Sequence, residues 1–488
     1  MIAALFRNHG PAWLAAGLVL IASTGLFTLF SHAFGYDVAV RDMPIGWLVG
    51  GLVGASALFL LLVPRLIRVS SADAKAARPL LLFIILAGVV MRLLLFASEP
   101  VLEDDYQRYL WDGALAANGL NPYAISPKAA QAAARESSVG RLVDQSGLVI
   151  GRINHPGLRT LYPPVAQGAF ALAHLLEPFS LRAWRAVILI LDCVSLLLLL
   201  ALLREAGRSP LWAALYWWHP LLLKEMFNSA HMEAVVIPFL LAGLLLAARG
   251  RLLFANLALS IAAGAKIWPA LLLPLVWRKL AMRPRDLAVA LACTAAIGLL
   301  CAWPLVSAGL DETSGLLAYA ARWKTNSALY PLLESGASAL LAASSISSLS
   351  PSLLARSLIA LAICAVALFQ ARSAFSTLDD LITRALVITA CVFLLSPAQF
   401  PWYYLWVLPL LALRPVPGLL LAGATLPLYY SAFHFLTHGS YTDFTRYVVW
   451  IIWLPVWGVL LRDIAGNGRQ AAVRAQDRAA AGARREER

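Results

Sequence analysis

The segment LLLFIILAGVVMRLLLF-ASEPVL-EDDYQRYLWDG, Leu80–Gly113, joins a long apolar run directly to a cluster of acidic and aromatic residues. The run Leu80–Phe96 is long enough to cross a bilayer as a helix. Similar runs recur along most of the chain. Because a helix satisfies all of its backbone hydrogen bonds internally, repeated runs of this kind predict an all-α polytopic membrane protein.

Composition supports the same class. The 488 residues are 61% hydrophobic and 13% charged, whereas a soluble domain has about a quarter of its residues charged. No soluble core accommodates that much apolar surface. We therefore expect one membrane-embedded domain over residues 1–461, with an outer loop at about 97–183, and a basic tail at 462–488.

The apolar runs predict about 12 to 14 transmembrane helices, several of them short. No internal repeat relates them. The expected spans are Ala12–Phe30, Ile45–Val63, Leu80–Phe96, Trp184–Leu203, Leu211–Leu223, Ala234–Ala248, Leu253–Ala265, Trp268–Trp277, Leu287–Leu305, Leu353–Ala371, Ala385–Leu395, Trp402–Leu413, Leu419–Phe435 and Val448–Leu461.

The positive charge predicts the orientation. The net charge is +13, and the cations lie in short loops such as Arg278–Arg285 and in the tail, as the positive-inside bias requires. We expect both termini to be cytoplasmic and Ala97–Leu161 to lie outside the plasma (inner) membrane. This orientation holds only if Tyr162–Leu176 is an interfacial helix. The charge distribution does not indicate nucleic-acid binding.

The acidic segment carries the strongest chemical signal. Its three adjacent carboxylates are Glu103, Asp104 and Asp105. On a helix, Asp105, Tyr109 and Asp112 would share one face, and Asp104 and Arg108 would pair at i, i+4. Clustered carboxylates raise one another's pKa, which suits a general base near neutral pH. The alternative is an acidic helix start that interacts with the helix dipole.

Two further segments add polar groups on the predicted outer side. INHPGLRTLYPPVAQ, Ile153–Gln167, offers His155 and Tyr162 as ligand-binding side chains, although its prolines also fit a rigid loop. HPLLLKEMFNSAHMEA, His219–Ala234, concentrates charge at a turn between apolar helices. Its candidates are Lys224, Glu225, Asn228, His231 and Glu233. Charged groups at membrane depth are costly and are usually functional.

The last two segments offer a cation and an aromatic surface. Lys266 in AGAKIWP stands alone in an apolar hairpin and would bind an anion such as a lipid phosphate, or extend to the interface. SPAQFPWYYLWVLPLL, Ser396–Leu411, places Gln399 and Tyr403 at an outer turn. Aromatic belts explain such a turn without function, although aromatic faces also suit sugar rings.

These segments together resemble the GT-C superfamily of membrane glycosyltransferases. The chain is most similar to polyprenyl-phosphate-mannose-dependent mannosyltransferases, which include the catalytic subunit of glycosylphosphatidylinositol mannosyltransferase I and bacterial relatives. The matching elements, in order between about residues 100 and 410, are EDDYQRYLWDG, Tyr162–Pro164, His219–Leu221, His231–Glu233, Ala265–Pro269 and Gln399–Trp406. The chain departs from the family pattern in three ways. It has Glu233 where the family has Asp and His219 where the family has Asn, and two additional spans precede the family's usual first helix.

The resemblance implies a GT-C fold and inverting transfer of a sugar, with mannose as first candidate, from a polyprenyl-phosphate donor to a lipid or glycan acceptor in the cell envelope. It implies Asp105 as the base, with Asp104 second. Glu233 would orient a substrate, and Lys266, followed by His231 and Lys224, would neutralise the leaving phosphate. Tyr106, Arg108 and Tyr109 would contact substrate. No metal or other cofactor is expected, because a lipid-phosphate leaving group does not require one by charge.

Two other classes stay open. A transporter or flippase for a lipid-linked sugar would carry ionisable groups at mid-membrane and broken helices in both halves, whereas here the polar groups gather on one face. A non-catalytic scaffold for envelope assembly would tolerate the change Asp105→Asn.

Overall fold

The computed structural model describes residues 9–71, 74–344 and 349–466, and apart from one isolated β-bridge the regular secondary structure of these residues is helical. Most of the predicted basic tail, residues 467–488, lies outside this part. Within the described ranges, eight helices are long and apolar enough to cross a membrane. They are Gly10–Phe34, Ile45–Ser70, Ala77–Leu95, Leu181–Glu205, Pro284–Ser307, Pro351–Gln370, Pro417–Thr437 and Tyr441–Gly466. The chain is therefore an all-helical protein of the multi-pass membrane type.

Most expected spans correspond to helices. The longer ones are α2 (Gly10–Phe30), α3 (Ile45–Ser70), α4 (Ala74–Leu95), α9 (Leu181–Glu205), α12 (Glu233–Ala248), α13 (Leu252–Ala265), α15 (Pro284–Ser307), α18 (Pro351–Gln370) and α19 (Leu378–Leu395). Three expected spans are interrupted. Trp268–Trp277 is the 3-10 helix η6 (Trp268–Leu272) followed by α14 (Leu273–Leu280), and Trp402–Leu413 is the 3-10 helix η7 (Pro401–Trp406) followed by α20 (Leu408–Leu413). Leu419–Phe435 consists of α21 (Pro417–Thr425), the 3-10 turn η8 (Leu426–Tyr430) and α22 (Ser431–Thr437). Two helices, α16 (Gly315–Arg322) and α17 (Leu329–Ala343), lie where the sequence predicted only a loop.

The expected span Leu211–Leu223 is wrong as a continuous helix. It consists of the 3-10 turn η4 (Pro210–Ala213), the short helices α10 (Ala214–Trp217) and α11 (Pro220–Leu222), and the π-helical turn η5 (Leu223–Asn228). Pro220 breaks the hydrogen-bond ladder because it has no N–H to donate. His219 caps the restarted helix by accepting from the Leu221 N–H at 3.2 Å.

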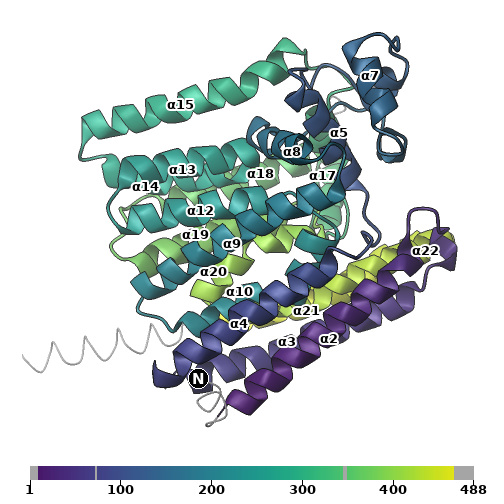
Figure 1. Cartoon of the computed structure of the whole chain (residues 1–488). Helices are drawn as coiled ribbons and strands as arrows, with labels where there is room; N and C mark the ends of the chain where they lie inside the picture. The colour runs from purple at the N-terminus through teal and green to yellow at the C-terminus, as the bar shows by residue number, and fades with distance from the viewer. Residues whose placement is uncertain (1–8, 72–73, 345–348, 467–488) are drawn as a thin grey trace, which may run out of the picture.

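The segment between α4 and α9, where the sequence predicts an outer loop, contains four helices. These are α5 (Asp105–Ala117), α6 (Pro127–Gln131), α7 (Ser138–Gln145) and α8 (Pro164–Leu176). Figure 1 shows α5, α7 and α8 gathered at one end of the helical bundle, opposite the end where α2 begins. The helix predicted to follow the acidic cluster is confirmed, and α8 packs along it.

A buried ion pair joins the helices beneath this end. Arg92 of α4 donates to Asp192 of α9 at 2.7 Å, and both side chains are fully buried. Arg92 also donates to the Trp217 carbonyl, while Tyr216 donates to Asp192. Because a charge at membrane depth requires a partner, this pair fixes α4 against α9 and therefore fixes the point at which the acidic segment leaves the bundle.

Candidate functional site

The loop that carries the acidic cluster is held by buried polar groups. Arg185 of α9 donates to the carbonyls of Ser98 and Asn228, both at 2.8 Å. The Asn228 side chain accepts from the Val101 N–H at 3.0 Å and donates to the Glu99 carbonyl. Asn228, predicted to bind substrate, instead joins η5 to the loop before α5. This network positions the three carboxylates.

Asp104 and Asp105 share one hydrogen-bond donor. Asn154 donates to Asp104 Oδ1 at 2.6 Å and to Asp105 Oδ1 at 3.1 Å, and Tyr162 donates to Asp105 Oδ2 at 3.2 Å. Burial, together with the charges of Asp105 and Glu103, raises the pKa of Asp104 to about 7. Asn154 was not predicted as a site residue, although it directly precedes His155 in the polar segment Ile153–Gln167. The paired carboxylates can accept a proton near neutral pH.

The predicted Asp104–Arg108 pair is wrong. Asp104 is the N-cap residue of α5, and among the described residues no ion pair joins its carboxylate to Arg108. Arg108 instead donates to the carbonyls of Leu158 at 2.9 Å and of Asn154 and His155 at 3.1 Å. Arg108 therefore holds the segment that supplies Asn154 against the start of α5.

The predicted face of α5 packs on α8. Tyr109 stacks on Phe170 with ring centroids 4.6 Å apart. Asp112 is buried and accepts from Gln167 at 3.3 Å. Burial raises the pKa of Asp112 to about 6. Of the face Asp105, Tyr109 and Asp112, only the first two line the cavity described below.

The interpretation of Lys266 as a lone cation is wrong, because its ammonium pairs with Glu233. The Lys266 side chain is 22% exposed and that of Glu233 is 1% exposed. Lys266 Nζ also lies 4.6 Å from the ring centroid of Tyr403 and 4.8 Å from that of Trp406, within cation–π range. Glu233 Oε2 has no hydrogen-bond partner among the described residues. The pair thus presents a cation on an aromatic surface and a buried acceptor with unused capacity.

These groups line one cavity of about 1470 Å³. The structure therefore brings together elements far apart in the sequence: the acidic segment, the loop before α8, the start of α12, the end of α13 and the turn before α20. The predicted site residues on its wall are Asp104, Asp105, Tyr106, Arg108, Tyr109, His155, Tyr162, Glu233, Lys266 and Tyr403. Tyr319 of α16 also lines the cavity and was not predicted as a site residue. Its hydroxyl forms a hydrogen bond with the Tyr403 hydroxyl.

Besides Asn228, three predicted site residues lie behind the cavity wall. Lys224 is buried and donates to Tyr430. Gln399 is buried and donates to backbone carbonyls at the end of α19. His231 is buried and stacks on Trp402 with centroids 4.0 Å apart. The sequence pattern indicates residues near the site, but it does not distinguish those on the cavity wall from those buried behind it.

One arm of the cavity, lined by α13 and α15, is mostly apolar. Its lining includes Ser260 and Gly264 of α13 and Ile297, Gly298 and Cys301 of α15. A side chain added at Gly298 would meet no atom within 4 Å. In Figure 1, α15 lies at the edge of the bundle, with α13 as its neighbour. The arm is therefore suited to an apolar chain continuous with the polar end.

The loop between α2 and α3 forms another part of the wall, which the sequence did not predict. Tyr36 and Asp37 line the cavity, and Arg152 holds them there. The Arg152 guanidinium pairs with Asp37 at 3.1 Å and lies 4.5 Å from the Tyr36 ring centroid. A short loop between two apolar spans gives no sequence signal for this contact.

Comparison with protein-family models, with curated proteins and with solved structures gives no match for this chain. The functional argument therefore rests on the geometry of the cavity.

Proposed function

We propose that this protein is a GT-C-type membrane hexosyltransferase. It transfers a sugar, with mannose as first candidate, from a polyprenyl-phosphate donor to a lipid or glycan acceptor on the extracytoplasmic side. The observation that carries the proposal is the single cavity, in which paired carboxylates, the Lys266–Glu233 pair and an apolar arm between α13 and α15 are continuous. These three features match the acceptor, the sugar phosphate and the lipid tail of such a donor.

The reaction uses the carboxylates as base. As an acceptor hydroxyl oxygen attacks the anomeric carbon, its proton passes to Asp105 or Asp104, and the bond between that carbon and the phosphate oxygen breaks. Attack opposite the leaving group inverts the anomeric configuration. Asp105 stays our first choice, because Tyr162 and Asn154 fix both of its oxygens. The pKa of Asp104 makes that neighbour a close second.

The leaving group is a lipid phosphate, and Lys266 is suited to it. A fixed cation near a developing negative charge stabilises the transition state. The rings of Tyr403 and Trp406 hold Lys266 in position. Glu233 Oε2, buried and without a partner in the described structure, would accept a hydrogen bond from a sugar hydroxyl.

The rival transporter interpretation receives less support. The buried pair Arg92–Asp192 is ionisable at membrane depth, but every charge of this pair is directly compensated and neither residue lines the cavity. The polar residues that line the cavity include those of α5 and of the loop before α8, and Figure 1 shows these two helices at one end of the bundle.

The test is radiolabelled transfer by purified protein in lipid vesicles. Polyprenyl-phosphate mannose is compared with other polyprenyl-phosphate hexoses, using the wild type and Asp105→Asn. We expect transfer from one donor class to an envelope lipid acceptor and its loss in the variant. Movement of intact donor across the vesicle membrane, without formation of a glycosidic bond, would instead support the transporter.

A further inference from the structure

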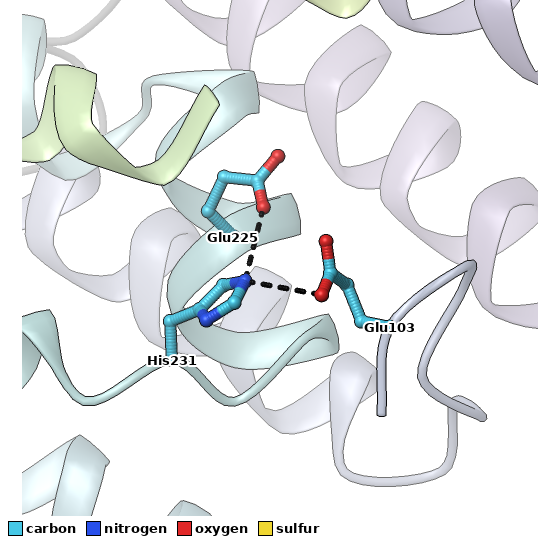
Figure 2. A group of neighbouring side chains, drawn as sticks. All are labelled: Glu103, Glu225 and His231. Atoms are coloured by element: carbon cyan, nitrogen blue, oxygen red, sulfur yellow. Dashed lines mark ion pairs between the residues drawn. The ribbon is translucent and has the colours of Figure 1, made fainter. Parts of the chain in front are cut away.

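A second cluster of ionisable groups extends from the cavity wall into the layer behind it. Glu103 precedes α5, Glu225 lies in η5, and His231 lies in the turn before α12; Figure 2 shows the three side chains pointing toward one another. His231 Nε2 is 3.6 Å from Glu103 Oε2 and 3.7 Å from Glu225 Oε2. One ligand atom from each residue lies within 4.8 Å of the others. The side chains of His231 and Glu225 are fully buried, and that of Glu103 is 8% exposed.

The atoms that meet here lack hydrogen bonds. Within the described residues, neither His231 Nε2 nor Glu225 Oε2 has a hydrogen-bond partner. Separations of 3.6 and 3.7 Å are too long for hydrogen bonds. A buried polar atom without a partner is costly, so the convergence of two of them on one point requires an explanation.

Each of these two side chains contacts a tyrosine hydroxyl through its other polar atom. The Tyr109 hydroxyl lies 3.5 Å from His231 Nδ1, which leaves Nε2 to face the carboxylates. Tyr430 donates to Glu225 Oε1 at 2.5 Å, which leaves Oε2 to face His231. Metal-binding histidines and carboxylates are held in this way by hydrogen bonds on their other polar atom.

We propose that Glu103, Glu225 and His231 bind a divalent transition-metal ion of the Zn²⁺ or Mn²⁺ type. One imidazole nitrogen and two carboxylate oxygens are typical donors for such ions. Bonds of about 2.1 Å in tetrahedral geometry separate ligands by about 3.4 Å, close to the 3.6 and 3.7 Å between His231 Nε2 and the two carboxylates. The ion would tie η5 and the start of α12 to Glu103, and so position the neighbouring Asp104 and Asp105.

This ion lies behind the reaction cavity. Glu103 lines the cavity, but Glu225 and His231 do not. No metal is expected from the sequence for the leaving phosphate, whereas the proposed ion holds the acidic loop. The inference therefore does not depend on the glycosyltransferase proposal, and its test needs no transfer assay.

Lys224 is the competing charge. Its ammonium lies 3.5 Å from the same Glu225 oxygen and donates to Tyr430. Without an ion it offsets the carboxylates, and with an ion it repels. Removing this charge by Lys224→Met should therefore tighten metal binding, whereas a purely structural salt-bridge network would only lose stability.

The experiment measures Zn²⁺ and Mn²⁺ binding to the full-length protein, first stripped with chelator, by titration calorimetry and by metal analysis after gel filtration. The exposed histidines His434 and His438 have rings 4.2 Å apart and could also bind Zn²⁺. Both are therefore changed to Gln in the reference protein. We expect one ion per chain in this reference protein.

The variants locate the ion. Glu225→Gln and His231→Gln should each abolish the stoichiometric ion, and the exposed Glu136→Gln is the matched control that should keep it. Tyr430→Phe leaves all three ligands and should weaken binding about 10- to 100-fold. This variant keeps the test decisive if a ligand variant does not fold.

Two results would overturn the proposal. The first is a reference protein that binds no stoichiometric Zn²⁺ or Mn²⁺, which would make His231 a protonated partner of the two carboxylates. The second is binding that Glu225→Gln, His231→Gln and Tyr430→Phe all leave unchanged, which would place the ion elsewhere.

Discussion

The Lys266–Glu233 pair allows a stability role to be separated from a role in transfer. Lys266→Met leaves the Glu233 carboxylate, 1% exposed, without its cation. Removing one partner of a buried pair costs about 3–5 kcal/mol. Changing both, in Lys266→Met with Glu233→Gln, removes the uncompensated charge and should recover most of that loss. The measurement is thermal unfolding of the purified protein in detergent.

Transfer should respond differently. If Lys266 contacts the leaving phosphate, its loss removes a charged hydrogen bond worth about 1.5–3 kcal/mol. That loss corresponds to a fall of about 10- to 150-fold in kcat/KM. The double variant should therefore be stable but impaired. Glu233→Gln alone is the control, since it keeps the cation and should lose less activity than the double variant.

The decisive comparison is between the two assays. A double variant that transfers sugar at the wild-type rate would mean that Lys266 serves only to neutralise Glu233. The phosphate-binding role would then be wrong, whatever the stability data show.

The remaining predictions concern the base, the lipid arm and the effect of pH. Asp105→Asn should lower kcat by about 10²- to 10⁴-fold with little change in thermal stability; a larger loss in Asp104→Asn would move the base to that residue. Gly298→Leu should raise KM for long-chain donors but not for short-chain analogues. The control Gly54→Leu, at an exposed glycine outside the cavity, should leave KM unchanged for both donor lengths. Equal KM values for both donor lengths would refute an apolar-chain arm. Because burial raises the pKa of Asp112 from 3.8 to about 6, the folded protein holds that proton more tightly than the unfolded chain. Stability should be greatest below the unfolded pKa and fall as pH rises through 6. Between about pH 5 and pH 7.5, Asp112→Asn should remove about 1.4 kcal/mol of this dependence, seen as a smaller change in melting temperature over that range.

Patterns local in the chain were predictable. The helix at Asp105–Ala117 follows an acidic start with apolar periodicity, and the long helices follow from apolar runs. The break at Pro220 and the helix α17 were missed. A short apolar run does not show where its hydrogen-bond ladder fails, and α17 has Gly and Ser within a modestly apolar stretch.

Partners far apart in the chain were not predictable. Arg108 could be paired only with its sequence neighbours, yet it binds carbonyls some fifty residues away. The sequence predicts an unpaired Lys266, because Glu233 lies on another helix. The contact between Tyr36 and Arg152 had no sequence signal at all.

The sequence by itself determined a multi-pass helical membrane protein and the residue types available for chemistry, because hydrophobicity and charge act through local composition and helical period. Only the tertiary structure decided which of those residues face one cavity, which stand behind its wall and which pair with each other. Those relations depend on how helices pack across long separations in the chain, where a shift of one turn exchanges a buried partner for an exposed one.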